Sequence, residues 1–300
     1  MAPSPQYQKV RNLLLERRRA TPASSDVAEL RERLASAALP AGEDVRVTPV
    51  ELAGTAAECV VADGARDDQA VLYFHGGGFC LGSAATHRKL AGDLSRAVGC
   101  AVYVLEYRVA PEHPLPAAVE DAVSAFSALL ERYAADSLVL AGDSAGGTLA
   151  VLAAIGLRDA GSPMPAALVA LTPWLDYRCE DHSYLERAEG DPITLVPELR
   201  GYADWFLDGH DAADPLVCPL SADLRGLPPM LIHGGTGDVM CNDAARLADR
   251  ARSAGVDVTH RQVPDMMHVW HVFAGRVPEA TDAVDDIGSF ARRWLARLRT

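Results

Sequence analysis

One six-residue stretch, Gly-Asp-Ser-Ala-Gly-Gly at residues 142–147, limits the folds open to this chain more than any other. A short β-prone run precedes it at 137–141, and a longer run rich in Ala and Leu follows at 148–157 with the pattern of a buried helix. The glycines indicate a turn so tight that ordinary side chains would collide there. A strand that turns this sharply into a buried helix is typical of an α/β sheet.

Strand and helix patterns alternate on both sides of this turn. Strands are predicted at 45–52, 56–62, 69–74, 100–106, 137–141, 166–172, 229–233 and 257–263, and helices at 6–19, 25–38, 84–98, 116–133, 148–157, 195–207, 243–254 and 279–298. The first two strands, joined through Gly54, form an antiparallel pair, and the later alternation is typical of parallel strands. The fold class is therefore α/β, with an eight-stranded, mostly parallel sheet and helices on both faces.

A long insert separates the sixth and seventh predicted strands. It covers about residues 176–227 and contains the helical pattern at 195–207, so a bare loop is not expected. Together with residues 1–40, this insert can form a helical cap over the carboxyl ends of the strands, where ligands bind in open α/β sheets. No internal repeat or low-complexity linker divides the chain. We predict one domain over residues 1–300 with a discontinuous cap.

Charge and composition exclude several classes of function. The net charge of −13 argues against a nucleic-acid partner. The longest apolar run, 145–157, is too short for a membrane span, and the first residues lack the apolar core of a secretory signal. The six cysteines are scattered and form no C-x-x-C motif. We expect a reduced, cytoplasmic protein without stable membrane insertion; a homodimer is possible, although no pattern requires one.

The central turn has the form G-x-S-x-G between a strand and a helix, which is the pattern of a nucleophile elbow. In such a turn the hydroxyl of Ser144 stands clear of the backbone, while the helix start directs free N–H groups and its positive dipole end to the same place. The pattern alone is weak, because a glycine-rich turn can contain an incidental serine. Other parts of the chain have to support the catalytic interpretation.

A second glycine motif supplies that support. His75 is followed by Gly76, Gly77 and Gly78, directly after the third predicted strand. Three consecutive glycines allow the backbone to approach a ligand closely, and their N–H groups can stabilise an oxyanion together with the N–H of Ala145. The pairing of H-G-G-G with G-x-S-x-G is known from lipases and esterases. His75 is interpreted as a loop-holding residue and not as a base.

An acid and then a histidine are expected after the serine in this chain order. Asp238 follows the seventh predicted strand and is our candidate acid, whereas Asp243 lies at a helix start and is interpreted as its N-cap. Either His268 or His271 could be the base. We select His268 because it lies nearer the end of the eighth predicted strand, in the loop that should return to Ser144.

These residues predict acyl transfer. His268 would take the proton of Ser144 as the hydroxyl attacks an acyl carbonyl, and Asp238 would orient the imidazole. The oxyanion would bind the amides of the glycine loop and of Ala145, and water would release the acyl group in a second cycle. The mechanism requires no metal or organic cofactor, and its partner is a small-molecule ester.

Taken together, the motifs resemble the hormone-sensitive-lipase-like bacterial esterases, the α/β-hydrolase-3 type (family IV), from about residue 68 to the end. The supporting segments are His75–Phe79, Gly142–Gly147, Tyr107–Ala118, Thr172–Asp176 and Ser221–Pro229. The resemblance implies the α/β-hydrolase fold and a carboxylesterase for short- to medium-chain acyl esters. It assigns the oxyanion donors to Gly77, Gly78 and Ala145. The sequence around Asp238 departs from the family's usual D-P-L-x-D-E.

Other functions use the same scaffold. The pair of histidines at 268 and 271 is similar to a subset that includes monoterpene lactone hydrolases and acetyl hydrolases, so a lactone or an acetylated compound is an alternative substrate. An amidase or N-acetyl hydrolase could use the same triad, and a true lipase is a further alternative. A non-catalytic small-molecule receptor would predict a broken triad, whereas serine, acid and histidine candidates are all present here. The natural substrate does not follow from the motifs.

Overall fold

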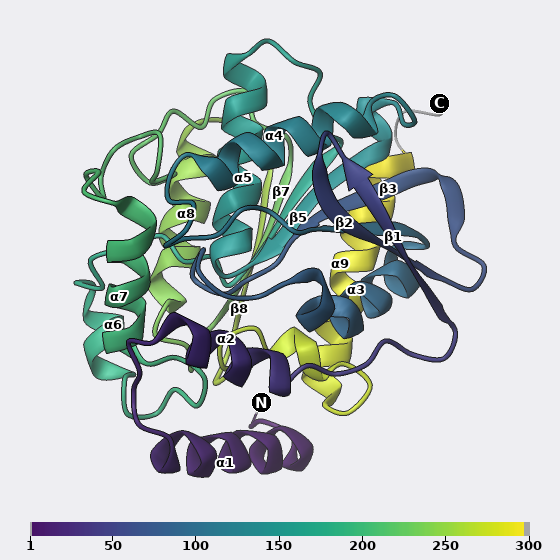
Figure 1. Ribbon diagram of the computed structural model, residues 1–300. Coiled ribbons are helices and arrows are strands. Elements are labelled where there is room, and N and C mark those ends of the chain that lie inside the picture. Colours follow the sequence, from purple (N-terminus) through teal and green to yellow (C-terminus); the bar gives the residue numbers. More distant parts are fainter. Residues whose placement is uncertain (1, 297–300) are drawn as a thin grey trace.

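The sheet that the sequence predicts is present in the computed structural model, which describes residues 2–296 (Figure 1). Within that range its eight strands lie in the order β1-β2-β4-β3-β5-β6-β7-β8. Their bounds are β1 Val45–Leu52, β2 Thr55–Ala62, β3 Arg66–Phe74, β4 Cys100–Leu105, β5 Leu138–Asp143, β6 Ala167–Leu171, β7 Met230–Gly235 and β8 Val258–Val263. β2 pairs antiparallel with both β1 and β4, and every later pair is parallel. The predicted α/β fold class is therefore correct.

Helices cover both faces of the sheet. Their bounds are α1 Pro5–Ala20, α2 Val27–Ser36, α3 Ala84–Val98, α4 Ala117–Leu129, α5 Ala145–Asp159, α6 His182–Glu186, α7 Val196–Leu207, α8 Cys241–Ser253 and α9 Pro278–Ala296, with short 3₁₀ turns η1 Ala135–Ser137 and η2 Trp270–Phe273. On one face α3 packs against α9, and on the other α5 packs against α4 and the central strands, while α8 packs against β7 and β8. The last two residues of the helix predicted at 279–298 lie outside the described range.

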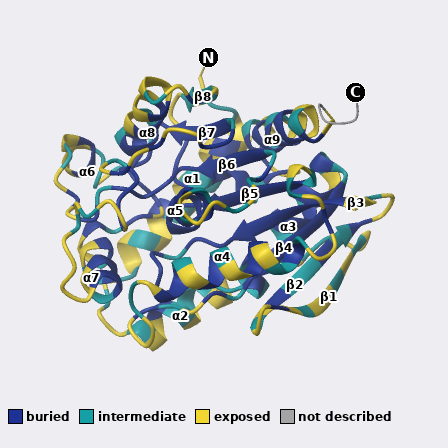
Figure 2. Cartoon of the chain, turned by 90° about the horizontal axis from the view of Figure 1, so that it is seen from above, coloured by how far each residue is buried: buried dark blue, intermediate teal, exposed yellow. Residues whose placement is uncertain are grey.

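Burial follows this layering. Every residue of β4, β5, β6 and β7 is buried, as parallel strands covered on two faces require. Figure 2 shows these strands as the dark interior, whereas β1 at the rim is mostly intermediate or exposed. The central strands therefore form a rigid base whose carboxyl ends carry the loops of the site.

Segments from both parts of the predicted cap contact those loops. In Figure 1, α1 and α2 lie at the bottom of the view and α6 and α7 at its left edge. Arg31 of α2 donates through Nε to the carbonyl oxygen of Cys80, 2.9 Å away, in the loop after β3. Ser183 of α6 donates to the carbonyl oxygen of Val239, 2.6 Å away, in the loop after β7. Among the described helices none has the length and apolar character of a membrane span.

Candidate active site

The turn at Ser144 has the strained geometry that its sequence predicts. β5 ends at Asp143 and α5 begins at Ala145, so Ser144 alone connects them, with φ 53° and ψ −124°. A positive φ is unfavourable for a residue with a side chain and persists only where the surroundings enforce it. A Cβ on Gly142 would collide with the backbone of Gly146, and a Cβ on Gly146 with that of Phe74. Close packing therefore requires both glycines of the motif.

The loop after β3 places its glycines beside this turn. Gly77 and Gly78 have φ of +122° and +62°, and a Cβ on Gly78 would collide with the ring of Tyr202 from α7. Among the described residues, no acceptor is bound by the amides of Gly77, Gly78 and Ala145. Ala145 is the first residue of α5, so its N–H lies at the positive end of the helix dipole. These three amides are free to receive an oxyanion.

The fourth predicted oxyanion donor, Gly76, is used differently. Its N–H donates to the carboxylate of Asp143 at 3.1 Å, and Nε2 of His87 lies 3.3 Å from the same nitrogen. The prediction that the Gly76 amide binds the oxyanion is therefore corrected, because this donor already has a buried acceptor. A Cβ at Gly76 would collide with the same carboxylate, so the glycine is required for this contact.

Asp143 connects the elbow to the glycine loop. Besides Gly76 it accepts a hydrogen bond from the hydroxyl of Tyr73 at 2.6 Å, and Nε2 of His87 lies 3.4 Å from its Oδ1. Burial opposes its charge, but His87 and Tyr73 outweigh burial and lower the pKa of Asp143 to about 2. The carboxylate is thus charged and fixes the glycine loop against the strand that carries Ser144. Sequence reasoning missed this role, although Asp143 lies inside the G-D-S motif.

His75 fits its predicted structural role. Its Nδ1 lies 2.9 Å from the carbonyl oxygen of Gly76, and its ring stacks on Tyr107 at 4.2 Å between centroids. Burial lowers the pKa of His75 to about 3, so the imidazole is neutral. The hydroxyl of Tyr107 also donates to the carbonyl oxygen of His75 at 2.7 Å. These contacts hold the start of the glycine loop.

Asp238 and His268 are brought together from loops that are 30 residues apart. Nδ1 of His268 lies 2.7 Å from Oδ2 of Asp238, whose Oδ1 accepts from the N–H of Met240 at 2.9 Å. The imidazole also lies close enough to Asp143, the residue before Ser144, for their charges to interact. His268 and Ser144 are each only 7% exposed. Asp238 and His268 thus form one buried pair, and the charge of the imidazole acts on Asp143, the residue before Ser144.

The charges around His268 determine its proton affinity. Burial disfavours the imidazolium, but the charge and hydrogen bond of Asp238, and then the charges of Asp191 and Asp143, raise the pKa of His268 above its ordinary value overall. An imidazole that accepts a proton readily, and whose charged form is stabilised, is suited to general base catalysis.

His271, the alternative base, lies in a different hydrogen-bond chain. Its Nε2 is 3.0 Å from Nδ1 of His233, and Nε2 of His233 is 3.2 Å from the carboxylate of Asp286. Burial lowers the pKa of His271 well below its ordinary value. The ring is fully buried and lies tilted against Trp270, with 4.0 Å between ring centroids, so it packs in the segment after the His268 loop, as expected.

Asp243 is not the N-cap that the sequence predicts. Met240 occupies the cap of α8, and Asp243 lies buried in the first turn. Its Oδ2 accepts from the N–H groups of Leu175 and Asp176, at 2.8 and 3.0 Å, and from the hydroxyl of Tyr184 at 2.8 Å. Burial raises the pKa of Asp243 to about 7. The residue therefore links the insert to α8 and is not bonded to the candidate base.

Asp191 is a further carboxylate near the site that was not predicted. It is fully buried in the insert, and its Oδ2 accepts from the N–H of Val239 at 3.1 Å, the residue after Asp238. Only folding brings positions 191 and 239 together, so the sequence offered no signal. Within residues 2–296, no group of three His, Cys, Asp or Glu side chains is arranged to hold a metal ion.

Comparison with known proteins shows the family to which the chain belongs. A family model described as alpha/beta hydrolase fold matches residues 71–272. The chain is 45% identical to an acetyl-hydrolase of Streptomyces hygroscopicus over 228 residues, which are 76% of each protein. It is 32% identical to an esterase of Acinetobacter venetianus, over 84% of each protein.

Solved structures extend the similarity to nearly the whole chain. A structure of the esterase EstE5 soaked with p-nitrophenyl butyrate superposes with a TM-score of 0.94 at 40% identity, covering 98% of this chain and 99% of the other. A structure described as an esterase from the bacterial hormone-sensitive lipase family gives a TM-score of 0.92 at 40% identity, covering 98% and 100%. The chain therefore belongs to the α/β-hydrolase fold family, among the esterases of the bacterial hormone-sensitive-lipase type.

Proposed function

We propose that this esterase is a serine carboxylesterase for short-chain acyl esters, with Ser144 as nucleophile, His268 as base and Asp238 as the orienting acid. The observation that carries the proposal is the 2.7 Å contact between Nδ1 of His268 and Asp238, beside a serine held at φ 53°. This contact leaves Nε2 as the nitrogen that can accept a proton from the serine hydroxyl.

In the first half-reaction, His268 takes the proton of Ser144 while the hydroxyl oxygen attacks the acyl carbonyl. Asp238 keeps the imidazole in the required tautomer and stabilises its charged form. The imidazolium then gives the proton to the departing alcohol, which leaves an acyl group on Ser144. Water, activated by His268, attacks that group in the second half-reaction and releases the acid.

The negative charge of each tetrahedral intermediate is assigned to the amides of Gly77, Gly78 and Ala145. Two of them belong to a loop fixed by Asp143, and the third lies at the start of α5. Donors that are already in place cost no reorganisation during the reaction, and one such donor typically contributes a factor of about 10²–10³ in rate.

Crowding around the oxyanion loop supports the preference for short acyl groups. Tyr202 of α7 lies against Gly78, and the ring of Phe206 stacks on Phe79 with 3.8 Å between centroids. The relative from Streptomyces hygroscopicus is named an acetyl-hydrolase. An acetyl ester is therefore the first substrate to test.

The test is hydrolysis of p-nitrophenyl esters from acetate to palmitate, by the native protein and by Ser144→Ala. We expect turnover that is highest for acetate to butyrate, and a loss in the variant of the order of 10⁶ in kcat, as for a triad nucleophile. Ser127→Ala, which removes an exposed hydroxyl from α4, is the matched control and should keep native activity. Residual activity of Ser144→Ala near the native level would refute the assignment of the nucleophile. Faster cleavage of p-nitroacetanilide than of the acetate ester would show that the preferred substrate is an amide and not an ester.

A further inference from the structure

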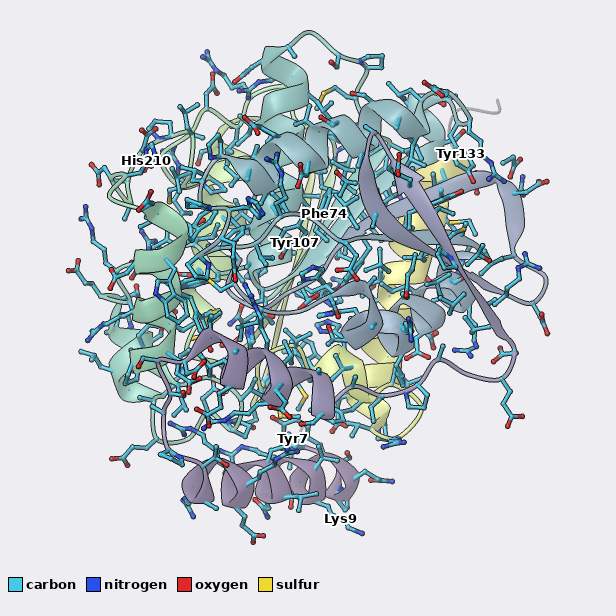
Figure 3. All side chains as sticks on the ribbon, in the orientation of Figure 1. Tyr7, Lys9, Phe74, Tyr107, Tyr133 and His210 are labelled. Carbon is cyan, nitrogen blue, oxygen red and sulfur yellow. The ribbon has the colours of Figure 1, made fainter. Side chains whose placement is uncertain are left out.

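The N-terminal helix α1 makes a contact that its exposed position does not suggest. Most of its residues face solvent, yet Tyr7 is only 1% exposed. Figure 3 shows Tyr7 on the side of α1 that faces the rest of the molecule, and Lys9 on the opposite side. Burial raises the pKa of Tyr7 to about 12, so its hydroxyl keeps its proton.

That hydroxyl joins two backbone groups beside the candidate base. It donates to the carbonyl oxygen of Asp265 at 2.6 Å and accepts from the N–H of Met267 at 2.8 Å. Met267 directly precedes His268, so one side chain from the start of the chain fixes the backbone from which the imidazole projects. Hydroxyls can donate and accept at once, and both capacities are used here.

The loop that carries His268 needs such support. Asp265 and Val269 both have positive φ, 62° and 44°, although neither is glycine. Non-glycine residues in this region are strained and keep the conformation only when neighbouring groups enforce it. In the loop after β7, the hydroxyl of Thr236 accepts from the N–H of Asp265 at 2.8 Å. Tyr7 and Thr236 therefore both hold the backbone of this segment.

The same helix also holds the segment that contacts the candidate acid. Arg18 donates to the carbonyl oxygens of Ala188 and Asp191, each 2.7 Å away, and Arg11 donates to that of Gly190 at 2.7 Å. The buried carboxylate of Asp191 in turn accepts from the N–H of Val239 at 3.1 Å, next to Asp238. Contacts from α1 thus extend to Met267, the residue before His268, and through Asp191 to Val239, the residue after Asp238.

We propose that α1 is a positioning element for catalysis: Tyr7 sets the loop of His268, while Arg18, through Asp191, sets the loop of Asp238. This inference rests on the proposed function. It assigns to α1 a task distinct from covering the substrate, because α1 contacts backbone groups in the loop of His268 and in the segment that bonds the loop of Asp238. A misplacement of about 1 Å in such a pair can cost on the order of 10²-fold in rate.

The deciding variant is Tyr7→Phe in the full-length protein, which removes one oxygen and keeps the ring. We expect kcat for p-nitrophenyl acetate to fall about tenfold or more, with KM within about twofold, because two backbone groups lose their partner and the base loses its orientation. Inactivation by diethyl p-nitrophenyl phosphate, which also needs the Ser144–His268 pair, should slow by a similar factor.

The matched control is Tyr103→Phe. Tyr103 is another buried tyrosine, 3.1 Å from the hydroxyl of Tyr133 and 3.2 Å from Nη1 of Arg132, and it takes no part in the site. We expect it to change thermal stability about as much as Tyr7→Phe does, without lowering kcat. Comparison of the two variants separates loss of a buried hydrogen bond from loss of positioning.

Several results would overturn the inference. If native protein hydrolyses the ester and Tyr7→Phe retains native kcat, or raises only KM, α1 does not position the pair. If Tyr7→Phe fails to fold, Arg18→Met provides the test, and native kcat in that variant has the same meaning. An inactive native protein would instead reject the proposed function, on which the inference depends.

Discussion

Single carboxylates connect the separate loops of this site. Asp143 joins the serine turn to the glycine loop, Asp238 contacts the imidazole, and Asp191 reaches the N–H of Val239 beside Asp238. Burial, with the charge of Asp238 adding to it, raises the pKa of Asp191 to about 6. Because these buried carboxylates lie near one another, the charge on one shifts the pKa of the titratable groups around it.

Removal of the Asp191 charge should alter the pH dependence of the reaction. The charges facing His268 come from Asp238, Asp191 and Asp143, all of which favour the imidazolium, and the neighbouring His271 is neutral. In Asp191→Asn the pKa of His268 should therefore fall. Because the base must be neutral to act, the acid limb of kcat/KM should move to lower pH, with the maximum reduced by less than about tenfold.

The measurement is a pH–rate profile for p-nitrophenyl acetate from pH 5 to 9. Asp223→Asn, an exposed carboxylate paired with Arg225, is the control and should leave the acid limb in place. If the acid limb of Asp191→Asn is unchanged, or moves to higher pH, the charge of Asp191 does not raise the pKa of His268.

At the scale of elements, local patterns predicted most of what the structure contains. The strand pair at 45–52 and 55–62 and the helix at 84–98 lie within one residue of their predicted bounds, because turns at Gly54 and Gly99 end them locally. The order of the strands and the contacts of Tyr7 and Asp191 were not predictable. Tyr7 meets Asp265 across 258 residues, and such proximity arises only from the packed sheet.

The errors at the site have the same origin. Gly76 and Asp243 were each assigned from their position in a local motif, as an oxyanion donor and an N-cap. In the fold, each meets a partner from a distant segment: Gly76 meets Asp143, and Asp243 meets Leu175. Motifs therefore located the site, whereas long-range partners decided which donors remain free.

Helix α7 should control substrate binding more than the chemical step. Its Phe206 stacks on Phe79 at the end of the glycine loop, and its Tyr202 lies against Gly78. We expect Phe206→Leu to lower thermal stability by up to about 1.5 kcal/mol, and to raise KM for p-nitrophenyl butyrate severalfold with a smaller effect on kcat. The measurements are thermal unfolding and steady-state kinetics.

Phe126→Leu is the matched control for this change. Phe126 is also fully buried, on α4 in the same hydrophobic cluster, but among the described residues its ring is not one of those that pack on Phe79. Its substitution should cost similar stability and leave KM unchanged. Equal KM values in the two variants would mean that α7 has no direct part in substrate binding.

On the scale of the whole molecule, the beginning and the end of the chain are joined. Ser4, the N-cap of α1, donates its hydroxyl and its N–H to the carboxylate of Glu279, at 2.7 and 2.5 Å. Glu279 lies in the first turn of α9, which packs on the sheet beside α3. Burial opposes the charge on Glu279, but the hydrogen bonds from Ser4 outweigh burial and lower the pKa of that carboxyl. The negative charge also lies at the positive end of α1.

This junction predicts where the molecule opens first. Loss of the carboxylate in Glu279→Ala removes two charge-assisted hydrogen bonds, so local detachment of α1 should become easier by about 1 kcal/mol, or about fivefold in population. Trypsin should then cleave after the exposed Arg17 and Arg19 of α1 about fivefold faster than in the native protein, while the rest of the chain resists. Glu112→Ala, which breaks the ion pair between Glu112 and Arg31 of α2, should leave this first cleavage at its native rate. Glu279→Ala could instead be cut no faster than the native protein, or be cut first elsewhere. Either result would mean that α1 is held by its contacts with the loop of His268 and the segment of Asp191, and not by the bond between Ser4 and Glu279.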